Sequence, residues 1–252
     1  MTPVSVERRG RVAWLVLDSP ERRNALGTDT VRDLTSALRT ADAAEDIGAI
    51  VLTGRGEVFS AGADLKEFQA SLQDNATRHW QTGEPWFDLF SLVPSLSKPV
   101  IAAVNGPALA GGCGLVAVCD LAVAAERATF ATPEVNIGLF PLFILPALIR
   151  AVGRRHAMSL AMTGRTIDAA EAERIGLVSM VAADDSFDTA VREYAEKLAA
   201  KMPFTMGLGK HVFSRIAEVD YTSGLEFARA VRGAFLASDD LRRGTATFFA
   251  RR

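Results

Sequence analysis

Two loops rich in small residues are the first places where this sequence could carry chemistry. They are residues 59–66, FSAGADLK, and residues 105–114, NGPALAGGCG. Each follows an apolar run typical of a buried strand and opens into a helix, whose first N–H groups lack internal acceptors and lie at the positive end of the helix dipole. Small side chains let a ligand approach the main chain closely. Two such loops side by side would aim a pair of N–H donors at one oxygen, which is the arrangement of an oxyanion hole.

The spacing of these loops also fits a purely structural role, because glycine-rich turns between strands and helices are common. No G-x-G-x-x-G follows in register, so a dinucleotide site is not indicated, and no G-x-S-x-G is present to suggest a serine nucleophile. His79, His156 and His211 lie far apart with no partner at ligand spacing, so we predict no metal. Cys113 and Cys119 are expected in one helix, where a rise of about 9 Å exceeds disulfide geometry. They are predicted to be free thiols.

The elements that must position these loops alternate between strand and helix. A hairpin is expected over 7–18, a helix whose N-cap residue is Thr28 after that, and buried strands over 49–54, 100–104 and 121–125. This rhythm is typical of an α/β fold. Further helices are expected at the C-terminal end, over residues 186–201, 203–218, 221–237 and from 239 to the end.

The change in character along the chain predicts two regions. Residues 1–195 are expected to form the core domain, and residues 196–252 a helical oligomerisation region that packs on the same core or on another copy of the protein. The polar, irregular segment 69–97 is predicted to be a mobile surface insertion.

Composition and charge exclude several classes of protein. The 252 residues are 49% hydrophobic and 23% charged, which excludes a disordered chain, and the formal net charge of -2 supplies no field for nucleic acid or an anionic membrane. Residues 99–119 are uncharged over the length of a membrane span, but Asn105-Gly106-Pro107 breaks them into strand, loop and helix. No secretory signal is evident at the start. We therefore expect a cytoplasmic protein that binds neither nucleic acid nor membrane.

The sequence resembles the enoyl-CoA hydratase/isomerase family, the crotonase superfamily, nearly end to end. The motifs that carry the resemblance are residues 23–26, 48–54, 59–66, 98–114, 119–121, 130–138, 163–164, 172–178 and 239–252. The resemblance implies a spiral of ββα units followed by a C-terminal helical trimerisation region, and a homotrimer or a dimer of trimers. It also implies an acyl-CoA thioester as substrate, with coenzyme A entering only as part of that substrate and no separate cofactor.

By the same resemblance, the thioester oxygen would be held by the main-chain N–H groups of Ala63 and Gly111. The family's substrate-contacting segments fall here on Arg23, Ala25, Ala61, Asp64, Leu65, Lys66, Gly112, Gly114 and Leu139. Arg22, Arg23 and Lys66 are the cations expected near the coenzyme A phosphates, although a cation in such a position, taken alone, is more often a solvated surface charge.

Family hydratases place two glutamates around the substrate. The first falls at Gly114 and is therefore missing, whereas the second matches Glu134. Out of context a Glu after Pro is a solvated helix start. The apolar residues that follow Glu134 would exclude water and raise its pKa toward that of a useful general acid or base.

One carboxylate favours double-bond isomerisation over hydration, because a 1,3 proton shift needs only one base above an enolate. Asp120 or a residue of segment 69–97 is the candidate replacement for the missing acid. The absent glutamate also leaves open decarboxylation, or a catalytically silent acyl-CoA-binding or interaction protein on the same fold. RNA binding would need a basic face, and the Arg pairs are too scattered for one.

A second departure from the family pattern follows Glu134. The residues from Leu139 to Pro146, LFPLFILP, replace a glycine-rich turn. They are expected either to fill the core or to line an acyl pocket, and in the second case an apolar acyl chain would be favoured over a carboxylated one.

Overall fold

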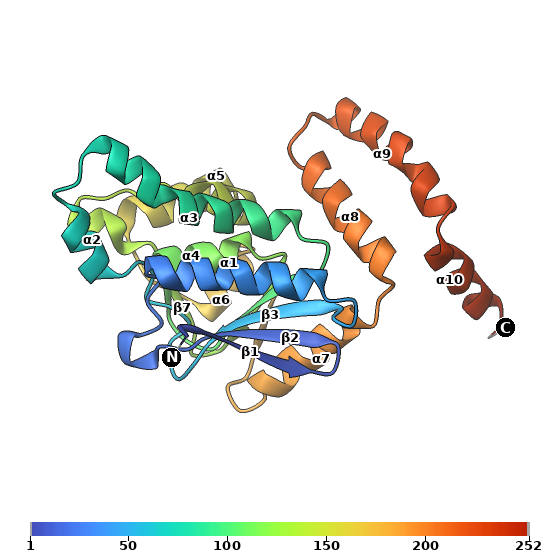
Figure 1. The fold of residues 1–252 in the computed structure, drawn as a ribbon, viewed down its shortest axis with the longest axis horizontal. Helices are drawn as coiled ribbons and strands as arrows, with labels where there is room; N and C mark the ends of the chain where they lie inside the picture. The colour runs from blue at the N-terminus through green and yellow to red at the C-terminus, as the bar shows by residue number, and fades with distance from the viewer. Residues whose placement is uncertain (1, 251–252) are drawn as a thin grey trace.

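The computed structural model describes residues 2–250 as a twisted sheet covered by helices on both faces (Figure 1). The sheet has the order β1-β2-β3-β4-β6-β9, with β1 antiparallel to β2 and every other neighbouring pair parallel. Its strands are β1 (Val4–Arg9), β2 (Val12–Leu17), β3 (Ala49–Gly54), β4 (Val100–Val104), β6 (Leu121–Ala125) and β9 (Met180–Ala182). The predicted α/β class, the hairpin and the three buried strands are confirmed.

Alternate residues along the strands feed two separate cores, as the period of a strand requires. Ile50 and Leu52 point to the face covered by helices α1, α3 and α4, whereas Ala49 and Val51 point to the face covered by α7. The helices of the body are α1 (Thr28–Ala43), α2 (Leu65–Ser71), α3 (Ala76–Ser95), α4 (Gly111–Val118), α5 (Leu145–Thr163), α6 (Ala169–Arg174) and α7 (Phe187–Ala199). Burial on both faces explains why these strands read as continuous apolar runs.

The N-terminus of α1 differs from the prediction. Gly27, not Thr28, is the N-cap residue, and it offers no side-chain acceptor. The carboxylate of Glu67 on α2 accepts hydrogen bonds from the N–H and hydroxyl of Thr28, each at 2.9 Å. A distant side chain therefore supplies the cap.

Segment 69–97 is not an irregular insertion; that prediction was wrong. Asn75 caps α3 by accepting from the N–H of Arg78, and the helix runs for 20 residues despite Pro85 and Pro94. Its buried side chains are confined to Leu89, Leu92 and Val93 at the C-terminal end, where α3 packs on α1. The N-terminal half remains free to form the wall of a cavity.

A small second sheet, β5-β7-β8, links the loops that follow the main strands. It comprises β5 (Ala108–Leu109), β7 (Thr129–Ala131) and β8 (Ile167–Asp168), while short 3₁₀ helices cover Pro20–Arg22 and Pro133–Ile137.

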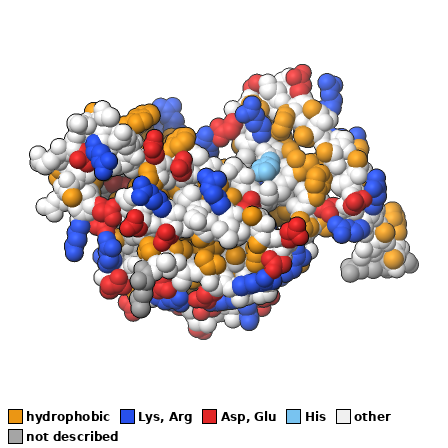
Figure 2. Space-filling view, viewed as in Figure 1, with side chains coloured by type: hydrophobic (Ala, Val, Ile, Leu, Met, Phe, Trp, Pro, Cys, Tyr) orange, Lys and Arg blue, Asp and Glu red, His pale blue; other side chains and the backbone are white. Residues whose placement is uncertain are grey.

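Three helices follow the body of the fold: α8 (Pro203–Ile216), α9 (Tyr221–Leu236) and α10 (Asp239–Ala250). Figure 1 shows them extending to one side, with only α8 lying against the body. Hydrophobic side chains gather over them in Figure 2. The exposed ones include Phe213, Tyr221, Leu225, Phe227, Leu236, Leu241 and Phe249. Among the described residues, no helix has both the length and the apolar character that a membrane span requires.

Candidate active site

Short stretches of strand pairing hold the two small-residue loops and Glu134 next to one another. The N–H of Leu109 donates to the carbonyl of Ser60 at 2.9 Å, which joins the first loop to the second. The second loop is in turn joined to β7, because β5 pairs with β7 and the N–H of Ala110 donates to the carbonyl of Ala131 at 2.9 Å. Glu134 stands three residues beyond Ala131. The topology thus brings three distant segments to one place.

The loops touch at Gly62 and Gly111. A Cβ added at Gly62 would lie 2.7 Å from the Cβ of Ala110 and 3.0 Å from the nitrogen of Gly111, and Gly62 has a φ of +86°. Only glycine fits such a position. Ala110, the N-cap residue of α4, has a φ of 49° and a ψ of -122°, a sparsely populated conformation for a residue with a side chain. Such strain is maintained where the surrounding structure fixes it, often at functional sites.

The N–H groups of Ala63 and Gly111 have no hydrogen-bond acceptor among the described residues. Gly111 is the first residue of α4, so its N–H also lies at the positive end of that helix. Both residues line the same cavity. The pair is therefore free to donate to a ligand.

Glu134 contributes a carboxylate with one unpartnered oxygen to this cavity. Its Oε2 atom is buried and has no hydrogen-bond partner in the described part of the chain. Burial raises the pKa of Glu134 above its ordinary value, and a backbone hydrogen bond lowers it less. The direction agrees with the expectation from the apolar sequence around it. A buried carboxylate oxygen without a partner is costly to stability, so its presence beside a cavity points to function.

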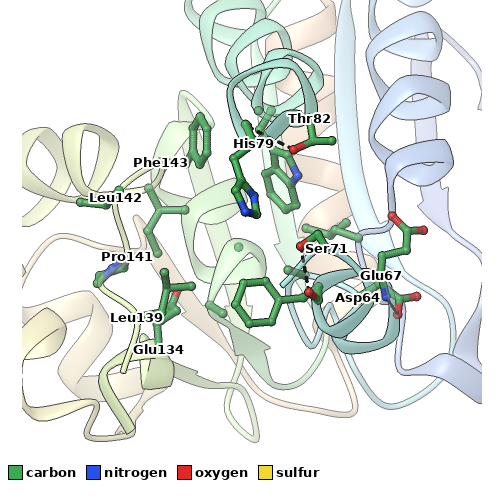
Figure 3. Close-up of a pocket in the computed structure, with 18 of the residues that line it drawn as sticks. Asp64, Glu67, Ser71, His79, Thr82, Glu134, Leu139, Pro141, Leu142 and Phe143 are labelled. Atoms are coloured by element: carbon green, nitrogen blue, oxygen red, sulfur yellow. Dashed lines mark hydrogen bonds between the residues drawn. The ribbon is translucent and has the colours of Figure 1, made fainter. Parts of the chain in front are cut away.

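The cavity has a volume of about 400 Å³ and a largely apolar wall. Figure 3 shows Glu134, Leu139, Pro141, Leu142 and Phe143 on one side and the residues of α2 and α3 on the other. Leu139 to Ile144 all line the cavity, and Ile144 and Pro141 are in addition buried. The stretch therefore fills part of the core and also lines the cavity, and its contact with an acyl chain stays a prediction. Helix α3 contributes four residues to the cavity wall, namely His79, Thr82, Gly83 and Trp86.

The structure places the predicted site residues in two groups. Ala63, Asp64, Gly111, Glu134 and Leu139 line the cavity. The others lie outside its wall and comprise Arg23, Ala25, Ala61, Leu65, Lys66, Gly112 and Gly114. Arg23, Leu65 and Lys66 are exposed, and the carbonyl of Arg23 accepts from the N–H of Ala61 at 2.9 Å.

Asp64 already has partners of its own. Its carboxylate caps α2 by accepting from the N–H groups of Lys66 and Glu67, and it forms an ion pair with Arg22. These contacts give Asp64 and Arg22 a role in holding the first loop.

Neither Gly114 nor Asp120 provides a second acid to the cavity. A Cβ added at Gly114 would lie 2.6 Å from the Cβ of Ile144 and 3.0 Å from Cζ of Phe90, so apolar side chains fill the space beside it. Asp120 lines a different cavity, where it pairs with Lys210 at 2.7 Å.

Cys113 is no nucleophile in this setting. Burial, with a smaller contribution from the charge of Glu134, raises the pKa of the Cys113 thiol to about 12, so the thiol stays protonated. Cys113 and Cys119 are both free, as predicted. Among the residues that the structure describes, no cluster of three His, Cys, Asp or Glu could hold a metal ion.

The α2 and α3 wall is the part of the site that the sequence did not reveal. Its members are separated from the small-residue loops along the chain and show no motif of their own. The only available signal was helical spacing in segment 69–97, which its prolines and polar residues obscured.

Two free amides and the half-buried Glu134 share one cavity of this α/β fold, and the fold is that of the crotonase class of enzymes. The family model described as enoyl-CoA hydratase/isomerase matches residues 7–252. A probable enoyl-CoA hydratase of Rhizobium meliloti (strain 1021) is 40% identical over 250 residues, covering 98% of this chain and 95% of the relative. The chain belongs to the enoyl-CoA hydratase/isomerase family.

Solved structures agree over nearly the full length. Enoyl-CoA hydratase of Mycobacterium smegmatis matches with a TM-score of 0.94 and 33% identity, covering 99% of this chain and 97% of that one. Human enoyl coenzyme A hydratase domain-containing protein 3 matches with a TM-score of 0.94 and 32% identity, covering 99% and 98%. The crotonase-like fold expected from the sequence is confirmed, and the chain is an acyl-CoA enzyme of this family.

Proposed function

We propose that this enzyme shifts the double bond of an enoyl-CoA by moving a proton, and that it does so in preference to adding water. The observation that carries the proposal is the carboxylate of Glu134, whose buried Oε2 atom has no hydrogen-bond partner among the described residues, beside two free amides on the same cavity. Hydration requires a water to be oriented and deprotonated, and a further proton to be delivered. Within the described part of the chain, Glu134 is the carboxylate of this wall with a free buried oxygen, so a second carboxylate to orient and deprotonate the water is missing there. Losing such a general base typically costs about 10² to 10⁴ in rate. A proton shift makes fewer demands.

In this proposal the thioester oxygen accepts hydrogen bonds from Ala63 and Gly111. Glu134 removes a proton from the α-carbon, and the resulting enolate is stabilised by the two amides and by the dipole of α4. The raised pKa of Glu134 suits this task, because a stronger base takes a weakly acidic proton more readily.

The acyl chain would lie along the apolar wall formed by Leu139, Phe140, Leu142, Phe143 and Trp86. Such a wall favours an apolar acyl group over one that ends in a carboxylate. Lys66 and Arg23 are exposed side chains beside the first loop, and we assign them to the coenzyme A phosphates.

We propose further that the apolar faces of α8, α9 and α10 are covered in a homotrimer or a dimer of trimers, because a monomer rarely exposes so many large apolar side chains together. The predicted division into a core over residues 1–195 and an oligomerisation region over 196–252 belongs to this proposal, with the boundary moved to the end of α7, because that helix runs to Ala199 and packs in the core. Two free thiols support a reducing, cytoplasmic location. We expect no cofactor besides the coenzyme A of the substrate.

The test is incubation with a panel of 2-enoyl and 3-enoyl thioesters, followed by mass spectrometry and chromatographic separation of the isomers. Double-bond migration without a gain in mass supports the proposal. A mass gain of one water would show hydration instead, and no product from any member of the panel would favour a silent acyl-CoA binder.

A further inference from the structure

We propose that His79 is a second proton-transfer group of this site, acting across the cavity from Glu134. The inference rests on the proposed isomerisation and goes beyond it by assigning the residue that delivers a proton to the substrate's γ-carbon. His79 comes from the N-terminal half of α3 and lines the cavity that also contains Ala63, Gly111 and Glu134. Figure 3 shows its imidazole ring projecting into the space between the α2 side and the wall formed by Leu142 and Phe143.

The second acid cannot come from helix α4. Ile144 and Phe90 occupy the space into which a side chain at position 114 would grow. Ile144 is buried, and Phe90 stacks on Trp86 with ring centroids 6.2 Å apart, so this packing is part of the core and not a gap. Any further acid must therefore belong to another part of the cavity wall.

The titratable side chains on that wall are Asp64, Glu67, His79 and Glu134. Asp64 caps α2 and pairs with Arg22, and Glu67 accepts both hydrogen bonds from Thr28. The neighbouring hydroxyls of Ser71 and Thr82 donate to carbonyls of their own helices.

The imidazole ring of His79, by contrast, has no hydrogen bond or ion pair within residues 2–250. His79 and Glu134 are thus the titratable side chains of this wall whose polar atoms remain available to a substrate. Histidine is also the residue that most readily gives and takes a proton near neutral pH.

The proposed step balances without any co-reactant other than water. Glu134 takes a proton from the α-carbon of a 3-enoyl thioester, and the C–H electron pair moves into the enolate. When the carbonyl re-forms, the double bond shifts to the α,β position and the former β,γ electron pair takes a proton from the N–H of the His79 imidazolium. Glu134 then loses its proton to water and His79 regains one from water, so the net change is double-bond migration.

The experiment is isomerisation of a 3-enoyl thioester in D₂O, comparing the native protein with His79→Gln. The readouts are the initial rate and the deuterium content of the γ-carbon by mass spectrometry. With His79 present, the γ-hydrogen comes from solvent, so nearly one deuterium is expected per product molecule at low conversion. In His79→Gln the carboxylate must carry the same proton from α to γ. We expect the rate to fall by about 10², and part of the product to retain the substrate's own hydrogen.

His156→Gln is the matched control, because His156 is an exposed histidine on α5 that does not line the cavity. It should behave as the native protein does, and circular dichroism should show all three proteins folded. If His79→Gln matches the native protein in both rate and deuterium content, the assignment of His79 is wrong while the isomerisation stands. If the native protein gives no isomerised product, the proposed reaction and the role of His79 in it both fail.

Discussion

Two acidic residues in this protein, Glu134 and Asp120, have pKa values raised for the same reason, but their hydrogen-bond partners and their positions in the fold differ. Burial is the largest cause in both cases. Asp120 is stabilised by Lys210 at 2.7 Å and by the N–H of Val100 at 2.7 Å, and the carbonyl of Lys98 accepts from the same lysine at 3.0 Å. Glu134 has a buried oxygen, Oε2, that has no hydrogen-bond partner within residues 2–250.

The comparison teaches that a shifted pKa alone does not identify a catalytic residue. Asp120 joins β4 and β6 to α8, so its carboxylate serves the fold. Glu134 projects from a short 3₁₀ helix into a cavity shared with two free amides, so its carboxylate remains available for chemistry. The surroundings decide which of the two can act.

The largest effect should come from removing each carboxylate's charge in turn. Glu134→Gln should lower kcat for the enoyl thioester by about 10² to 10⁴, because the base is lost while the side chain keeps its size. Asp120→Asn should lower stability and leave the kcat of the folded protein near the native value. Steady-state kinetics with urea unfolding checks both, and comparable loss of kcat in the two variants would remove the distinction.

A second large effect is expected at the contact between the loops. Gly62→Ala introduces a Cβ where Ala110 and the Leu109 carbonyl already lie within 2.7 Å, at a φ of +86°. The loops must separate, so the N–H of Ala63 or that of Gly111 should no longer point at the thioester oxygen. The loss of one such donor typically costs about 10² to 10³ in kcat. Gly209→Ala is the control, since its Cβ would meet nothing within 4 Å; equal activity in the two variants would contradict the role of the contact.

The partner of Asp120 offers a test of the structural side of the comparison. Lys210→Met should lower the free energy of unfolding by about 3 kcal/mol, because it leaves a largely buried carboxylate without its cation. The double variant with Asp120→Asn should recover part of that loss. A double-mutant cycle in urea measures the coupling, and simple additivity of the two losses would show that the pair does not interact as described.

The smallest effect should be a gain in stability. Because burial raises the pKa of Glu134 in the folded chain, stability is lost as pH rises through that pKa, and Glu134→Gln avoids the loss. The variant should therefore be slightly more stable than the native protein at pH 8. The difference should vanish at a pH below the ordinary range of glutamate. Thermal unfolding across pH 4–8 checks the sign, and a variant less stable at pH 8 would contradict it.

The parts of the molecule that local sequence determines were the parts that could be predicted. Strands β3, β4 and β6 are short apolar runs bounded by turns, and the two loops between them stand out by composition. The wall contributed by α3 could not be predicted in this way. The buried residues of α3, Leu89, Leu92 and Val93, form only a short apolar stripe, and Pro94 follows it directly.

The remaining failures share one cause, which is contact between distant segments. The cap of α1 comes from Glu67 on α2, and the space beside Gly114 is filled by Ile144 thirty residues later. The resemblance to the family implies that Gly114 replaces a glutamate, but only the packing shows that no side chain fits there without moving Ile144. The fold was therefore more predictable than the details of the site.

The most direct measurement is deuterium incorporation at the α-carbon of a saturated acyl-CoA, such as butanoyl-CoA, followed in D₂O by NMR or mass spectrometry. It requires only the thioester, the two amides and Glu134, so it is independent of whether the enzyme isomerises or hydrates. The account predicts steady incorporation by the native protein and a loss of about 10² or more in Glu134→Gln. Incorporation at the same rate in that variant, or none above background in the native protein, would contradict it.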